Sequence, residues 1–147
     1  MMSLNLTTKI FIAADHAGFE LKNLLVNQFP QFIDLGTGSL DSVDYPDFAN
    51  LVCEKMKSDK NSMGILICGS GLGMMIRANR FSHINAALVY NEEITQLARS
   101  HNNANIICLG SRFVSSENAI KWISIFINTP FSEGRHRQRV DKTSQPT

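Results

Sequence analysis

The sequence has little of what marks several large classes of protein. Its 147 residues include three cysteines, whose irregular positions fit neither a zinc-ligand spacing nor a paired disulfide framework. No apolar run is long enough to span a bilayer, and the first residues lack the long apolar core of a signal peptide. The formal net charge is only +1, whereas a general nucleic-acid or membrane-surface binder needs a strong basic excess. We therefore expect a cytoplasmic protein with free thiols and with neither a nucleic-acid nor a membrane partner.

What the sequence does contain is an alternation of short apolar runs and amphipathic segments. The apolar runs predict five strands, at residues 9–14, 31–36, 64–68, 84–89 and 105–110. The amphipathic segments predict five helices, at residues 17–29, 46–59, 72–80, 91–102 and 115–128. Strand then helix, five times, predicts an α/β fold: one domain over residues 1–147 with a doubly wound (Rossmann-like), five-stranded parallel sheet and helices on both faces. The polar end, residues 143–147, is expected to fray.

Residues whose side chains could bind a ligand or take part in a reaction follow three of the predicted strands. Asp15 and His16 come after the first strand, Cys68 after the third, and Ser111 and Arg112 after the fifth. Ligands of parallel α/β sheets bind beyond the carboxyl ends of the strands. We therefore expect these residues to gather at one edge of the sheet.

The stretch CGSGLG, residues 68–73, combines a cysteine with a glycine-rich turn. Its glycines are spaced G-x-G-x-G, which is neither the dinucleotide fingerprint nor a Walker loop. A cysteine phosphatase would need an arginine where Met74 stands. The backbone N–H groups of such a turn, at the start of a helix, stabilise negative charge on a thiolate or on a nearby oxyanion. The alternative is a buried structural cysteine beside a packing turn, which is the interpretation given to Cys53 and Cys108.

The remaining candidates also have simpler interpretations. Asp15 and His16 can contact a sugar, but Asp15 can equally cap the following helix. Arg135 and Arg139 are four residues apart and suit a phosphate if the segment is helical, but the run can also be a solvated basic tail. His101 and its neighbour Asn102 can likewise form an ordinary helix C-terminus.

Seven blocks, in order between Lys9 and Val140, are more specific together than any single motif: ADHAGFELK, DYPDFA, ILICGSGLGM, RANRF, RSHNNAN, LGSR and GRHRQRV. They resemble type B ribose-5-phosphate isomerase and its relatives, the galactose-6-phosphate isomerase subunits. The resemblance implies an aldose–ketose isomerase for sugar phosphates that needs no metal or other cofactor. It also implies a doubly wound five-stranded sheet and a homodimer or a dimer of dimers.

The resemblance assigns a role to each matched residue. Cys68 matches the general base, which moves a proton between C1 and C2 of the open-chain sugar phosphate, and His101 matches the acid that helps to open the furanose ring. The expected substrate contacts are Asp15, His16, Tyr45, Gly69, Ser70, Gly71, Leu72, Gly73, Asn102, Arg112, Arg135 and Arg139. Among these, the turn at 69–73 matches the part that holds the enediolate oxygens, and Arg135 and Arg139 match phosphate ligands.

Two positions depart from the pattern of the family. Ser70 stands where many members have threonine, which keeps the hydroxyl. Met74 stands where some branches carry a glutamate base, so no carboxylate at that position replaces Cys68.

The sequence leaves two classes of function open. The first is the isomerase, with ribose 5-phosphate and ribulose 5-phosphate as the expected pair and galactose 6-phosphate or allose 6-phosphate as the alternative. The second is a phosphate-ligand binding module on the same fold, with an inert Cys68. Retention of Cys68, His101 and both terminal arginines favours the enzyme.

The predicted fourth helix also bears on assembly. About twelve residues at 1.5 Å each would carry His101 roughly 18 Å back along the sheet, away from Cys68. If both act on one substrate, two subunits must share each site, which predicts a two-fold homodimer. A shorter or bent helix, which would close the site within one chain, is the alternative.

Overall fold

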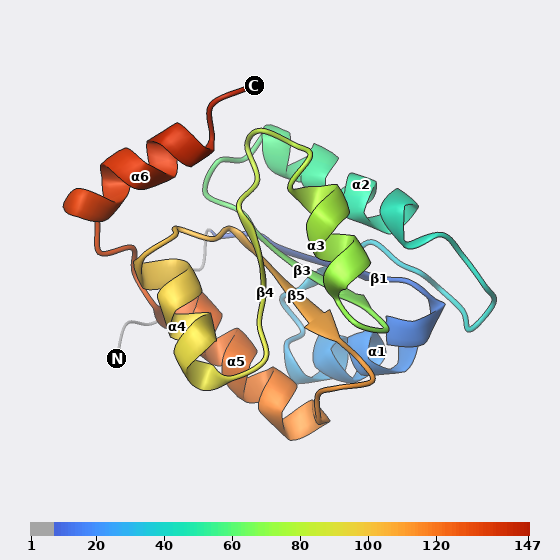
Figure 1. Cartoon of the computed structure of the whole chain (residues 1–147). Helices are drawn as coiled ribbons and strands as arrows, with labels where there is room; N and C mark the ends of the chain where they lie inside the picture. The colour runs from blue at the N-terminus through green and yellow to red at the C-terminus, as the bar shows by residue number, and fades with distance from the viewer. Residues whose placement is uncertain (1–7) are drawn as a thin grey trace.

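The computed structural model describes residues 8–147, which form a five-stranded sheet between two layers of helices (Figure 1). The strands are β1 (Ile10–Ala14), β2 (Ile33–Asp34), β3 (Met63–Cys68), β4 (Ala86–Leu88) and β5 (Ile106–Gly110). All neighbouring strands pair in parallel, in the order β2-β1-β3-β5-β4. The predicted fold class is therefore confirmed.

Helices follow the strands as the sequence predicted, with one addition. They are a 3₁₀ turn η1 (His16–Gly18) and α1 (Phe19–Gln28), α2 (Tyr45–Lys57), α3 (Leu72–Ala78), α4 (Glu92–Ser100), α5 (Ser116–Asn128) and α6 (Arg135–Thr143). The addition is α6, since the sequence left open whether the basic segment is helical. No helix of residues 8–147 is long and apolar enough to cross a membrane.

Two of the strands, β2 and β4, are shorter than expected by more than one residue, and side chains form hydrogen bonds beside both. After β2, the Asp34 carboxylate accepts a hydrogen bond from the Gly36 N–H at 2.9 Å, and the Leu35 N–H still donates to the Ile12 carbonyl of β1 at 2.9 Å. Asn79 hydrogen-bonds both the N–H (2.8 Å) and the carbonyl (2.9 Å) of Ala86, so a side chain replaces a neighbouring strand at the start of β4. Both strands lie at the borders of the sheet, where pairing is one-sided.

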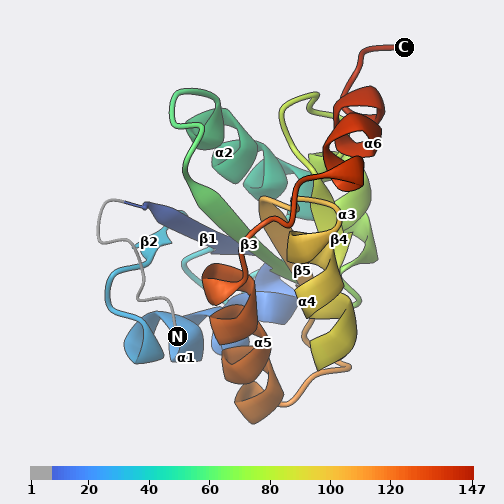
Figure 2. The same cartoon turned by 90° about the vertical axis from the view of Figure 1, so that its left-hand side faces the viewer.

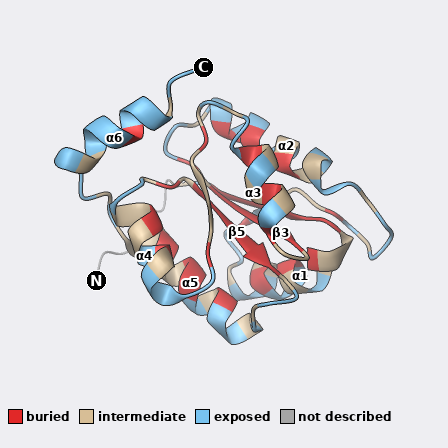
Figure 3. Ribbon diagram, viewed as in Figure 1, coloured by how far each residue is buried: buried red, intermediate tan, exposed pale blue. Residues whose placement is uncertain are grey.

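Successive side chains of the strands point alternately into two separate hydrophobic cores. Ile12, Ile67 and Leu109 point to the layer formed chiefly by α1 and α5, and they pack with Trp122 and Phe126 there. The strand residues between them point to the layer of α2 and α3. Figure 3 shows the central strands β3 and β5 buried and much of the outer faces of the helices exposed, whereas the border strands β2 and β4 are exposed and half-buried. Burying one such large side chain contributes about 1.5–3 kcal/mol, so both faces stabilise the sheet.

The chain path changes direction at the edge where the strands end, here called the carboxyl edge. The chain leaves β1 toward β2 on one side and leaves β3 toward β4 on the other. The loops after β1 and β3 therefore diverge, which is the switch point where ligands bind in such folds. The opposite edge, where the strands begin, is called the amino edge. Figures 1 and 2 show α6 apart from both helical layers, on the side where β4 begins.

Candidate active site

Cys68 ends β3 at the switch point, and its sulfur is held by the following turn. The thiol is 5% exposed, and Sγ accepts a hydrogen bond from the Gly71 N–H at 3.2 Å. Gly71 has φ of +79°, and a Cβ there would lie 2.6 Å from Leu88 Cδ1. Only glycine fits this backbone without strain, and the turn it makes aims an N–H group at the sulfur. Such a donor stabilises negative charge on Sγ.

The other two cysteines lack the environment of a nucleophile or base. Burial raises the pKa of the Cys53 thiol to about 12. Burial also raises the pKa of Cys108, which lies inside β5 and is fully buried, well above its ordinary value. Both remain neutral thiols at physiological pH, in agreement with the structural role given to them from the sequence.

The loop after β5 packs on the glycine turn and carries Arg112 to it. Backbone N–H groups of Ser111 and Arg112 donate to the carbonyls of Cys68 (2.9 Å) and Gly69 (3.1 Å). A Cβ on Gly69 would lie 2.9 Å from Arg112 Nη1, so the guanidinium covers this glycine. Within residues 8–147 Arg112 has no ion-pair partner. Its charge is therefore available to an anion beside Cys68.

The loop after β1 contributes Asp15 and His16 from the other side of the switch point. The Asp15 carboxylate accepts two N–H bonds of η1, at 3.0 and 3.2 Å, so it does cap the turn, as the simpler interpretation held. Its own N–H donates to the Ile67 carbonyl at 3.1 Å, which ties the turn to β3. His16 Nδ1 accepts from the Val43 N–H at 3.2 Å. In the neutral ring the proton is then on Nε2, which can donate to a ligand.

Tyr45 completes this group from the start of α2. Its ring lies against Gly73, where any Cβ would collide with the ring carbons. The structure thus brings together one set of expected residues, here called the cysteine half-site: Asp15, His16, Tyr45, Cys68, Gly69, Ser70, Gly71, Leu72, Gly73 and Arg112.

The other four expected residues lie elsewhere and are called the α6 half-site: His101, Asn102, Arg135 and Arg139. His101 directly follows α4, which has nine residues rather than the expected twelve and spans roughly 13 Å. Close by, the Asn105 N–H donates to the Asn85 carbonyl at 3.0 Å, just before β5 and β4 begin. His101 is therefore at the amino edge, although α4 is shorter than predicted.

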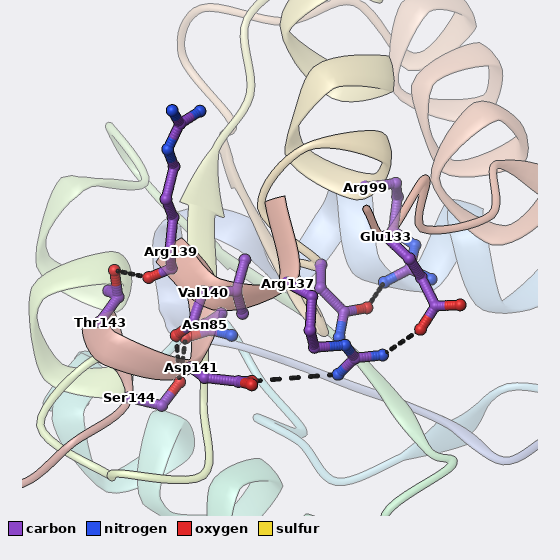
Figure 4. A network of polar contacts seen from close by, with 10 residues as sticks. Asn85, Arg99, Glu133, Arg137, Arg139, Val140, Asp141, Thr143 and Ser144 are labelled. Carbon is purple, nitrogen blue, oxygen red and sulfur yellow. Dashed lines mark hydrogen bonds and ion pairs between the residues drawn. The ribbon is translucent and has the colours of Figure 1, made fainter. Parts of the chain in front are cut away.

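The arginines of α6 differ in their partners. Arg137 pairs with Glu133 and lies 4.0 Å from Asp141, as Figure 4 shows. Arg135 and Arg139 form no ion pair within residues 8–147. Figure 4 shows the Arg139 side chain directed away from the Arg137 pair. The two arginines matched to phosphate ligands are thus the two that carry an uncompensated charge.

One residue of this region was not singled out from the sequence. The imidazole of His136 stacks on that of His101, with ring centroids 4.2 Å apart and planes 15° from parallel. Its position between two candidate arginines was the only signal in the sequence, because the stacked partner is 35 positions away in the chain. Among residues 8–147, no group of three or more His, Cys, Asp or Glu side chains could hold a metal ion.

Comparison with known proteins shows the family of this chain. The sequence model of the ribose/galactose isomerase family matches residues 10–143. A probable ribose-5-phosphate isomerase B of Mycoplasma pneumoniae is 46% identical over 138 residues, which cover 90% of this chain and 91% of that protein. A putative sugar phosphate isomerase of Bacillus subtilis is 40% identical over 142 residues, covering 92% and 95%.

Solved structures show the same fold. The crystal structure of ribose-5-phosphate isomerase B of Mycoplasma genitalium with bound ribulose 5-phosphate has a TM-score of 0.89 and 44% identity, covering 94% of this chain and 95% of that one. The Thermotoga maritima ribose 5-phosphate isomerase has a TM-score of 0.88 and 46% identity, covering 94% and 98%. Because the family model matches nearly the whole length of this chain, the chain belongs to the ribose/galactose isomerase family.

Proposed function

We propose that this protein interconverts ribose 5-phosphate and ribulose 5-phosphate through an enediolate, with Cys68 as the general base. One observation carries the proposal: the sulfur of Cys68 lies at the switch point and accepts a hydrogen bond from the Gly71 N–H. The loop that carries Arg112 packs on the same turn. A relative 44% identical to this chain binds ribulose 5-phosphate, which supports a pentose phosphate as the substrate.

The cysteine half-site has the groups that this reaction needs. Proton transfer between C1 and C2 requires a base beside the carbon and donors aimed at the developing oxyanion. The thiolate of Cys68 is the base, and the first N–H groups of α3, which lack intrahelical partners, face the enediolate oxygens. Arg112 adds positive charge beside the same turn. The Nε2–H of His16 is a further donor to the sugar or its phosphate.

Each complete site needs the α6 half-site of a second subunit. His101 lies at the amino edge of its own chain, so the acid that opens the furanose ring comes from a partner in a two-fold homodimer or a dimer of dimers. The carboxyl edge offers an apolar surface for that contact, at Leu72, Ile76, Tyr90 and Phe113, which are 48%, 55%, 62% and 79% exposed. The enzyme then works in the cytoplasm, where its thiols stay reduced.

A coupled isomerase assay on ribose 5-phosphate, allose 6-phosphate and galactose 6-phosphate tests the reaction. Activity on a hexose phosphate alone would replace the pentose assignment, and activity on none would favour a binding module. Mixing inactive Cys68→Ala subunits with His101→Ala subunits, whose conversion of ribose 5-phosphate is limited by uncatalysed ring opening, tests the sharing. Heterodimers should regain one complete site and about half of the wild-type activity. Exchange of subunits without recovered activity would exclude the shared site.

A further inference from the structure

The stacked imidazoles of His101 and His136 join two elements that meet only through tertiary structure. His101 follows α4, and His136 is in the first turn of α6. Parallel rings with centroids 4.2 Å apart are in van der Waals contact over most of their faces. The stack therefore restricts rotation of the His101 ring, which is otherwise exposed to solvent.

Two hydrogen bonds, one between backbone groups and one from a side chain, fix the segment that leads from α5 into α6. The Ser132 N–H donates to the Ser100 carbonyl at 2.9 Å, and Arg99 Nε donates to the Thr129 carbonyl at 3.1 Å. Val140 is buried and anchors the far half of α6. The end of α4 and the start of α6 are thus one connected unit, and His136 has a defined position against His101.

The charges around His136 favour a neutral ring. Burial, together with the positive charges of His101, Arg135 and Arg139, lowers its pKa. A neutral His136 ring can lie against a protonated His101 without repulsion, whereas two imidazolium rings at this distance would repel each other.

We propose that His136 is a positioning residue for ring opening, which holds the imidazole of His101 and links it to the phosphate-binding arginines of the same helix. Arg135 and Arg139 flank His136 on α6. A phosphate bound by these arginines fixes α6, and α6 through His136 fixes the acid that must reach the sugar ring. This inference rests on the proposed isomerase function and adds a residue to it.

The two directions of the reaction separate this role from a merely structural one. Ribose 5-phosphate is mainly a furanose and must open before the proton moves. Ribulose 5-phosphate has its 5-hydroxyl esterified, cannot close a furanose and enters the site as an open chain. A defect in ring opening therefore limits the conversion of ribose 5-phosphate, and at high enzyme concentration the rate should reach a plateau set by uncatalysed opening.

The experiment compares wild type, His136→Ala and His136→Phe in both directions over a range of enzyme concentrations. Without the stack, His136→Ala should convert ribose 5-phosphate roughly three- to tenfold more slowly and show the plateau. Its initial rate from ribulose 5-phosphate should change less than twofold and stay proportional to the enzyme. His136→Phe keeps a flat ring to stack on His101 and should restore most of the forward rate.

Matched variants give the controls. Arg137→Ala removes a side chain from the same helix that points to Glu133 and should change neither direction. His101→Ala should show the same plateau, and adding His136→Ala to it should cause no further loss, because the two act as a unit. A proton NMR signal of the His101 ring that shifts in His136→Ala would show the stack in solution.

Each failure has a distinct meaning. Equal losses in both directions, or no rescue by His136→Phe, would overturn the positioning role while leaving the isomerase in place. An unchanged forward rate in a folded His136→Ala variant would overturn it as well. No activity of the wild type in either direction would overturn the proposed function itself.

Discussion

The arginines of α6 allow a comparison within one helix turn. Arg139→Ala removes a guanidinium that has no ion-pair partner among residues 8–147, and Arg137→Ala removes one that is paired with Glu133 and lies near Asp141. If Arg139 binds the phosphate, loss of the Arg139 side chain removes a charge-assisted contact that contributes about 1.5–3 kcal/mol to binding. That is roughly a ten- to 150-fold increase in the KM for ribose 5-phosphate. Arg137→Ala should leave KM within about twofold, because its charge is already compensated.

The assay is steady-state kinetics on ribose 5-phosphate, with inorganic phosphate as a competing ligand. Arg139→Ala and Arg135→Ala should raise both the KM and the inhibition constant of phosphate, with a smaller effect on kcat. Arg139→Lys should recover part of the loss, since it keeps the charge but not the planar fork. Exposed pairs such as Arg137 with Glu133 add little stability, so thermal melting of all variants should stay close to wild type. Equal effects of Arg137→Ala and Arg139→Ala would refute the assignment.

Three further outcomes follow from the titrating groups. Cys68→Ala should lose most of the turnover while still binding ribose 5-phosphate, and Cys68→Ser should also be poor; near-normal kcat in Cys68→Ala would exclude it as the base. Alkylation of the folded protein at pH 8, read by mass spectrometry, should modify Cys68 and spare Cys53, whose pKa is raised by burial to about 12, and Cys108. Bound ribose 5-phosphate should slow the alkylation of Cys68. Since burial lowers the pKa of His136, the native state disfavours its charged form. Stability from this group is present above its unfolded pKa of about 6.5 and is lost as pH falls through the folded value, so Tm should decrease below pH 6 less in His136→Phe than in wild type.

The sequence by itself determined the fold class and which strand ends carry the polar residues of the cysteine half-site. Five apolar runs alternating with amphipathic segments permit a parallel sheet covered on both faces, because a strand buried on both sides must be apolar throughout. Residues that follow β1, β3 and β5 must meet at one edge of such a sheet, so Asp15, Cys68 and Arg112 could be grouped in advance. Even the placement of His101 at the other edge follows from the direction of α4.

The tertiary structure decided which side chains are free and which are engaged. The ion pairs of Arg137 with Glu133 and Asp141 are local i,i+4 pairs, which form because this segment is helical, a point that the sequence left open. The stack of His136 on His101, in contrast, joins residues that are distant in the chain. Secondary structure follows from local periodicity, whereas partners of exposed polar groups depend on how elements pack. That packing is fixed by the buried cores rather than by the polar residues themselves.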